Sequence, residues 1–140
     1  MSILFSEVIL VVLLEKIFRR KFFSSRDWRV VSIFGVVASL VLYPSALGLT
    51  RIDTYAWGWA CNGFVITVAG SALFLLWRKN KFGILLLLAL VASAFQFKSS
   101  TNLWDYFIDP IYAILAFVMI ARVVCLCLRR REIEDGMRGL

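Results

Sequence analysis

Residues 103–128 read LWDYFIDPIYAILAFVMIARVVCLCL, and the arginines at 129–131 follow directly. This run is long enough to cross a bilayer, because a membrane helix needs about 20 mainly apolar residues. Three further runs qualify or nearly do, at residues 30–49, 55–77 and 82–97. The sequence therefore predicts an all-α fold, a polytopic transmembrane helical bundle with four spans in a single membrane domain.

The composition of the 140-residue chain favours the same interpretation. Hydrophobic residues make up 61% of it and charged residues only 18%, whereas soluble domains contain about 45–50% apolar residues. A soluble fold of this size could not hide that much apolar surface from water. The links between the runs are short, which favours antiparallel neighbours in an up-down bundle.

The N-terminal segment 3–18 is apolar around most of its circumference, with Glu7, Glu15 and Arg19 on one stripe. A helix lying on the membrane needs a broad polar face, and this segment has only a thin line. A spanning helix has to place Glu7 some way into the hydrocarbon. The pattern thus leaves a spanning and an interfacial helix open. The segment 3–18 lacks the basic N-terminal region and the small-residue cleavage site of a signal peptide.

Lysine and arginine alternate along the chain in a way that predicts its orientation. Six precede the first of the four spans, the three links that follow hold one, three and one, and the end of the chain from Arg122 onward holds five. By the positive-inside rule, residues 16–29, 78–81 and 129–140 are cytoplasmic, while 50–54 and 98–105 face outward. We expect the inner (plasma) membrane of a bacterium. The bilayer explains these clusters better than nucleic acid does.

The residue inventory predicts no catalytic group, no cofactor and no metal site. Histidine is absent, and Cys61, Cys125 and Cys127 form no C-x-x-C pair. Histidine-based zinc, haem and proton-shuttle chemistry is therefore excluded. The chain also contains no P-loop and no G-x-S-x-G motif.

The densest polar cluster lies around Asp105 and Asp109, which are four residues apart and share one face of a continuous helix. Two carboxylates at an outer cavity could bind a cation or share a proton. The alternative is a pair of ionised acids at a helix start, where acids are favoured. Pro110, directly after Asp109, predicts that the last span begins or kinks there.

Other polar residues within the apolar runs are candidate ion or partner contacts. Arg122 is a candidate partner for Glu15 or Glu7, or for an anion; the alternative is that its long side chain extends to the inner headgroups. Asn62 requires a hydrogen-bond partner in hydrocarbon and often finds one on another helix.

Small residues recur at a spacing of four on two of the predicted spans. Gly63, Thr67 and Ser71 form one stripe, and Gly35 with Ser39 forms the other. Such stripes let helix backbones approach closely. They predict helix packing, either within one chain or between copies.

The expected function is that of a multi-pass membrane protein without catalytic activity. It would act through helix contacts with another membrane protein or with itself, as an accessory, assembly, immunity or exclusion protein. The second hypothesis is a small oligomeric channel or transporter for ions or protons that uses Asp109, Glu15 and Arg122. The third is an intramembrane enzyme that uses Asp105 and Asp109.

Overall fold

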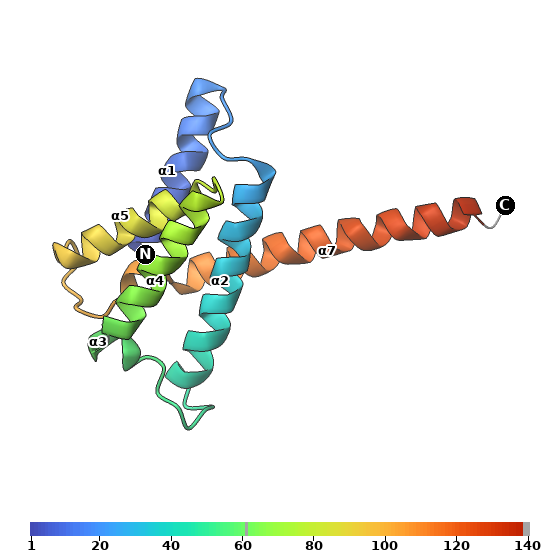
Figure 1. Cartoon of the computed structure of the whole chain (residues 1–140). Coiled ribbons are helices and arrows are strands. Elements are labelled where there is room, and N and C mark those ends of the chain that lie inside the picture. Colours follow the sequence, from blue (N-terminus) through green and yellow to red (C-terminus); the bar gives the residue numbers. More distant parts are fainter. Residues whose placement is uncertain (61, 139–140) are drawn as a thin grey trace.

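The computed structural model describes residues 1–60 and 62–138, with side-chain surroundings described except at residues 60, 62 and 130–138. This part of the chain is all helical, as predicted, and contains no strand. The helices, shown in Figure 1, are α1 (Ile3–Phe18), α2 (Ser25–Ala46), α3 (Trp57–Ala60), α4 (Asn62–Trp77), α5 (Phe82–Ala94), α6 (Trp104–Phe107) and α7 (Pro110–Arg138).

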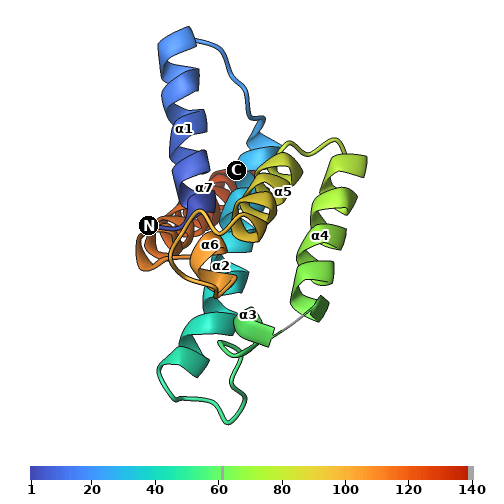
Figure 2. The same cartoon turned by 90° about the vertical axis from the view of Figure 1, so that its left-hand side faces the viewer.

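The helices do not form one uniform bundle. Helices α1, α2 and α4 run along a common direction and alternate in sense, whereas α7 crosses α2 and projects away from the other helices (Figures 1 and 2). The predicted up-down arrangement therefore describes α1, α2 and α4, whereas α5 and α7 run across that direction and depart from it (Figures 1 and 2).

Among the described residues, two helices are long and apolar enough to cross a membrane. They are α2, with mean hydropathy 1.6, and the Pro110–Arg129 part of α7, with mean hydropathy 2.6. Helix α4 has 16 residues and α5 has 13, so their lengths are about 24 and 20 Å at the helical rise per residue. The four predicted spans are thus not confirmed as four, because two of them are shorter than a bilayer-crossing helix.

Local backbone geometry explains where helices end. Helix α1 covers the segment predicted from residue 3 to 18 and stops at Arg19, which has a φ of 51°. Helix α5 stops three residues before the predicted end, and Gln96 likewise has a φ of 51°. Left-handed backbone at a non-glycine residue cannot continue a right-handed helix.

Helix α2 begins at Ser25, five residues before the predicted start of its span. The reason is a reciprocal capping box. The Ser24 hydroxyl accepts the Asp27 N–H at 3.2 Å, and the Asp27 carboxylate accepts the Ser24 N–H at 2.7 Å. These bonds satisfy donors that a helix start otherwise leaves unpaired, so the first turn forms although its sequence is polar.

The run from 103 to 128 is not one helix. Ile108, with φ −137° and ψ 145°, separates α6 from α7. Proline disfavours helical backbone in the residue before it, which is Asp109 here, and fits the first position of a helix itself. Pro110 therefore starts α7, which continues as a helix to Arg138, past residue 129, where the polar tail was predicted to begin.

The core lies where α1, α5, α6 and the first turns of α7 meet. Its most deeply buried large side chains include Leu4, Phe82, Leu86, Phe107 and Tyr112. Tyr112 stacks on Phe5 with ring centroids 5.8 Å apart, and its hydroxyl donates to the Val31 carbonyl at 2.7 Å. These contacts fix the start of α7 against both α1 and α2.

Candidate functional site

Asp109 joins the starts of α7 and α1. Its Oδ1 accepts the N–H groups of Ile111 and Tyr112, each at 3.0 Å, and its Oδ2 accepts the Ser2 N–H at 2.6 Å. Burial alone would raise the pKa of Asp109, but the hydrogen bonds from Ser2 and Tyr112 outweigh it and hold the pKa below its usual value. Asp109 is therefore an ionised helix cap.

Asp105 has a different set of partners. Its carboxylate accepts a short hydrogen bond from the Ser100 hydroxyl, and its carbonyl accepts the Lys98 ammonium at 3.1 Å. The shared helix face predicted for Asp105 and Asp109 required a continuous helix, and the break at Ile108 removes it. The hydrogen bonds of the two carboxylates thus come from separate parts of the chain.

Glu15 fixes the linker between α1 and α2. Its Oε1 accepts the Phe23 N–H at 2.6 Å. Arg122 is exposed on α7 and lines a groove together with Ser25 and Arg29 of α2. Among the described side chains, the structure shows no pairing of Glu15 with Arg122. The Glu15 carboxylate therefore binds the backbone of the α1–α2 linker, whereas the sequence suggested an ion pair with Arg122.

The remaining candidates differ in what surrounds them. Glu7 on α1 is half-buried, and its Oε2 has no hydrogen-bond partner among the described residues. The side chain of Asn62 lies outside the described residues, as does all of Cys61. Cys125 and Cys127 are exposed free thiols on α7. Within the described residues, no group of three histidine, cysteine or acidic side chains is placed to hold a metal ion.

Gly35 and Ser39 are buried where α2 crosses α7. A Cβ atom added to Gly35 would lie 2.6 Å from the Ala116 Cβ and 3.2 Å from the Tyr112 ring. The Ser39 hydroxyl donates to the Gly35 carbonyl at 2.5 Å. Only glycine allows this approach of α2 to α7, so this stripe packs within the chain.

Gly63, Thr67 and Ser71 are exposed instead, and they line an apolar groove of about 460 Å³ between α2 and α4. Thr67 donates its hydroxyl to the Gly63 carbonyl at 2.8 Å, and Ser71 donates to the Thr67 carbonyl at 2.7 Å. The hydroxyls are satisfied by their own helix. The groove thus presents an apolar surface that no element of the described residues covers.

A buried polar junction that the sequence analysis did not predict closes one end of this groove. Asn102 is fully buried; its Nδ2 donates to the Tyr55 carbonyl at 3.2 Å, and its Oδ1 accepts the Trp104 N–H at 2.9 Å. The Trp104 indole N–H donates to the Thr54 carbonyl at 2.9 Å. Trp104 also lines the groove. The sequence carries no local signal for this contact, because Tyr55, which accepts from Asn102, lies 47 residues away in the chain.

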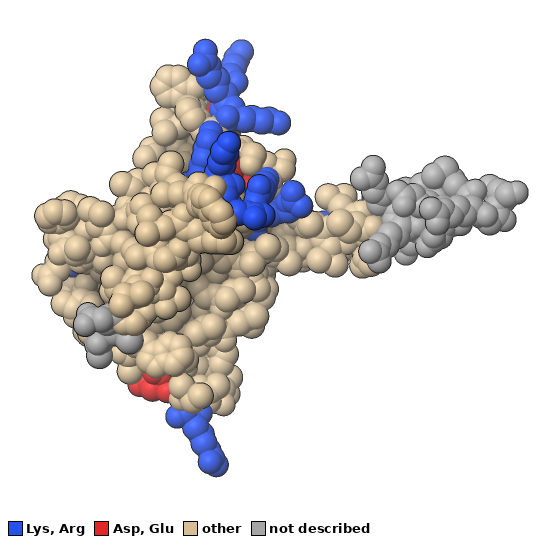
Figure 3. All heavy atoms as spheres, in the orientation of Figure 1, with Lys and Arg blue, Asp and Glu red and all other residues tan. Residues whose placement is uncertain are grey.

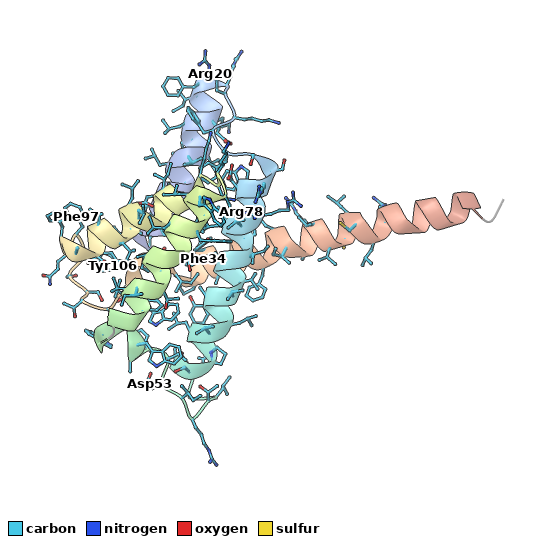
Figure 4. All side chains as sticks on the ribbon, viewed as in Figure 1. Arg20, Phe34, Asp53, Arg78, Phe97 and Tyr106 are labelled. Atoms are coloured by element: carbon cyan, nitrogen blue, oxygen red, sulfur yellow. The ribbon has the colours of Figure 1, made fainter. Side chains whose placement is uncertain are left out.

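Basic side chains gather at one end of the molecule, formed by the end of α1, the start of α2 and the end of α4 (Figure 3). Arg20 and Arg78 lie toward this end, and Asp53 lies at the opposite end (Figure 4). Lys81 connects the segments, because its ammonium donates to the Phe22 carbonyl at 2.7 Å and its N–H to Asp27 at 3.0 Å. The segments 16–29 and 78–81, predicted to share one membrane side, are therefore in contact.

No known protein family, no curated protein and no solved structure matches this chain. Its function is inferred from its own geometry.

Proposed function

We propose that this chain is a small multi-pass membrane protein that acts through helix–helix contacts with another membrane protein or with a second copy of itself. The observation that carries the proposal is the uncovered state of α7. In the 18-residue apolar stretch of Pro110–Arg129, only 17% is buried inside the protein, whereas 33% of the corresponding stretch of α2 is buried. A hydrophobic helix left this open requires lipid or another helix around it.

The open surface has the properties of a membrane helix contact. Ile111, Ile114 and Val118 are 57%, 63% and 45% exposed on α7, and the groove with Gly63, Thr67 and Ser71 adds a face of small residues on α4. In lipid, helices associate through close packing of small residues, because burial from water contributes nothing there. Accessory, assembly, immunity and exclusion proteins need such faces and no reaction centre.

The basic end supports a defined orientation in this proposal. It groups the α1–α2 linker with the α4–α5 turn, which the positive-inside rule assigns to the cytoplasm of a bacterial inner membrane. Helix α7 runs across the direction of α1, α2 and α4 in Figure 1, so the proposed cytoplasmic position of the C-terminal tail rests on its basic residues. Helix α1 runs along α2 and α4, which favours a spanning position for α1 over an interfacial one.

Site-directed cross-linking in native membranes tests the proposal. Cys61, Cys125 and Cys127 are first replaced by serine. Thr67→Cys or Ile114→Cys then places one thiol on an open face, and Ser39→Cys is the buried control. We expect oxidative or bifunctional adducts at the open positions, either with a second copy or with one discrete partner. Absence of adducts at both open positions would contradict the proposal.

Transport is the second candidate, because Glu7 places a carboxylate oxygen in the interior without a partner among the described residues. Asp109 and Glu15, by contrast, are engaged as backbone anchors. In proteoliposomes, a flux that Glu7→Gln abolishes would favour a channel or transporter for ions or protons. Loss of flux in Asp109→Asn or Glu15→Gln counts for transport only where the variant remains folded. Absence of flux in the wild-type protein favours the contact function.

A further inference from the structure

A basic pocket of about 580 Å³ lies between the α1–α2 linker, the first turn of α2 and the α4–α5 turn. Its lining includes three lysines, Lys21, Lys79 and Lys81, and two acidic residues, Glu15 and Asp27. The cations come from segments far apart in the sequence, which the fold brings to one end of the molecule (Figure 3). The pocket therefore carries an excess of positive charge.

The two carboxylates are already engaged by the protein. Glu15 accepts the Phe23 N–H, and Asp27 accepts donors from Ser24 and the backbone of Lys81. Lys81 in turn donates to the Phe22 carbonyl. Lys21 and Lys79 are exposed at the pocket, so their ammonium groups can reach a bound anion.

An apolar groove of about 640 Å³ adjoins this basic pocket, since Glu15 and Trp28 form part of the wall of both. The groove lies between α1, α2 and α7. Its apolar walls include Val12 and Leu13 of α1, Val31 of α2 and Leu115 of α7. Together the two cavities make a site that is basic at one end and apolar along its length.

We propose that this combined site binds an anionic phospholipid, with the headgroup phosphate held by Lys21 and Lys79 and an acyl chain lying in the apolar groove. The inference rests on the proposed membrane location. Basic pockets between helices on the cytoplasmic side recognise anionic headgroups, and lysine holds phosphate as a point charge. A bound lipid would also cover apolar surface of α1 and α7 that the chain leaves open.

The test measures lipid binding by the full chain purified in mild detergent. Phosphatidylglycerol and phosphatidylcholine with identical acyl chains are titrated, and binding is followed by native mass spectrometry and by the thermal midpoint. We expect phosphatidylglycerol to bind more tightly, with a preference that weakens at high salt. Each of Lys21→Gln and Lys79→Gln should weaken its binding about fivefold. Arg51→Gln, at the opposite end, is the matched control and should change nothing.

Two further experiments are needed. One distinguishes a lipid headgroup from a free phosphate, and the other tests whether the apolar groove contributes to binding. Glycerol phosphate and inorganic phosphate carry the anion without chains and should produce no comparable stabilisation. Val12→Trp fills the apolar groove at an exposed position and should weaken phosphatidylglycerol binding while the protein stays folded. Equal binding of phosphatidylcholine, or full binding by the Lys21/Lys79 double variant, would overturn the proposal. So would stabilisation by inorganic phosphate equal to that by the lipid. Adduct formation at Thr67 is independent of these results, so failure here leaves the contact function testable.

Discussion

The two stripes of small residues have the same spacing in the sequence and opposite surroundings in the structure. Gly35 is buried against Tyr112 and Ala116 of α7, and Ser39 is buried one turn further along α2. Gly63, Thr67 and Ser71 line an open groove between α2 and α4. The comparison shows that spacing identifies a face able to pack, whereas the path of the neighbouring helix decides whether it packs within the chain. That path is determined by the break at Ile108 and the cap at Asp109, which direct α7 across α2.

The largest expected effect is a loss of stability on filling the buried stripe. Gly35→Val places carbon atoms against Ala116 and Tyr112, and overpacking of this kind costs about 2–3 kcal/mol of the free energy of unfolding. Gly70→Ala is the control, because a Cβ added to Gly70 of α4 meets no atom within 4 Å. Denaturant unfolding in detergent, followed by circular dichroism, measures both. Equal stability of the two variants would contradict the helix crossing described here.

The next largest effect concerns the junction at the end of the open groove. Asn102→Ala leaves the buried Trp104 N–H unpaired and removes one of the two hydrogen bonds to the Tyr55 carbonyl, which keeps the bond from the Gly58 N–H. The loss should cost about 2 kcal/mol. The loss should also loosen Trp104 in the groove wall, seen as a shift of tryptophan emission to longer wavelength. An Asn102→Ala protein with wild-type stability and emission would show that the junction does not hold the groove.

Asp109→Asn weakens the cap that starts α7, with an expected cost of about 1 kcal/mol at neutral pH. Because the folded-state pKa of Asp109 is lowered, its stabilisation is present above the unfolded-state value near pH 4 and is lost as the pH falls through the folded-state pKa. The stability difference between wild type and variant should therefore shrink below about pH 4. A difference that stays constant down to pH 2 would disprove the assigned role.

The smallest effect on folding is expected at the open stripe. Thr67→Val and Ser71→Ala remove hydroxyls that bond only within α4, so the free energy of unfolding should change by less than about 0.5 kcal/mol. Bulk at the same face, as in Ser71→Leu, should reduce cross-linking from Thr67→Cys to a partner while leaving stability unchanged. Unaltered cross-linking would place the partner on another face.

Local patterns predicted the all-helical class, the residue bounds of α1 and the basic segments that lie at one end. These features depend on apolar runs, on clusters of charge and on helix-ending residues, all of which are visible in short stretches of sequence. The sequence also indicated a start or kink at Asp109 and Pro110. It did not predict the crossing of α7 over α2, the bond from Glu15 to the linker or the reach of Asn102 to Tyr55. Each of these depends on contacts between residues that only the tertiary fold brings together.

The central claim is that the α1–α2 linker and the α4–α5 turn share one membrane face, opposite the α2–α4 loop. Single cysteines at Lys21, Lys79 and Arg51, in a chain whose own cysteines are replaced by serine, test it by labelling of intact cells with a membrane-impermeant maleimide. Arg51→Cys should be labelled from outside, and Lys21→Cys and Lys79→Cys should react only after the membrane is opened. External labelling of Lys21→Cys or Lys79→Cys, or recovery of the whole chain in the soluble fraction, would contradict the account.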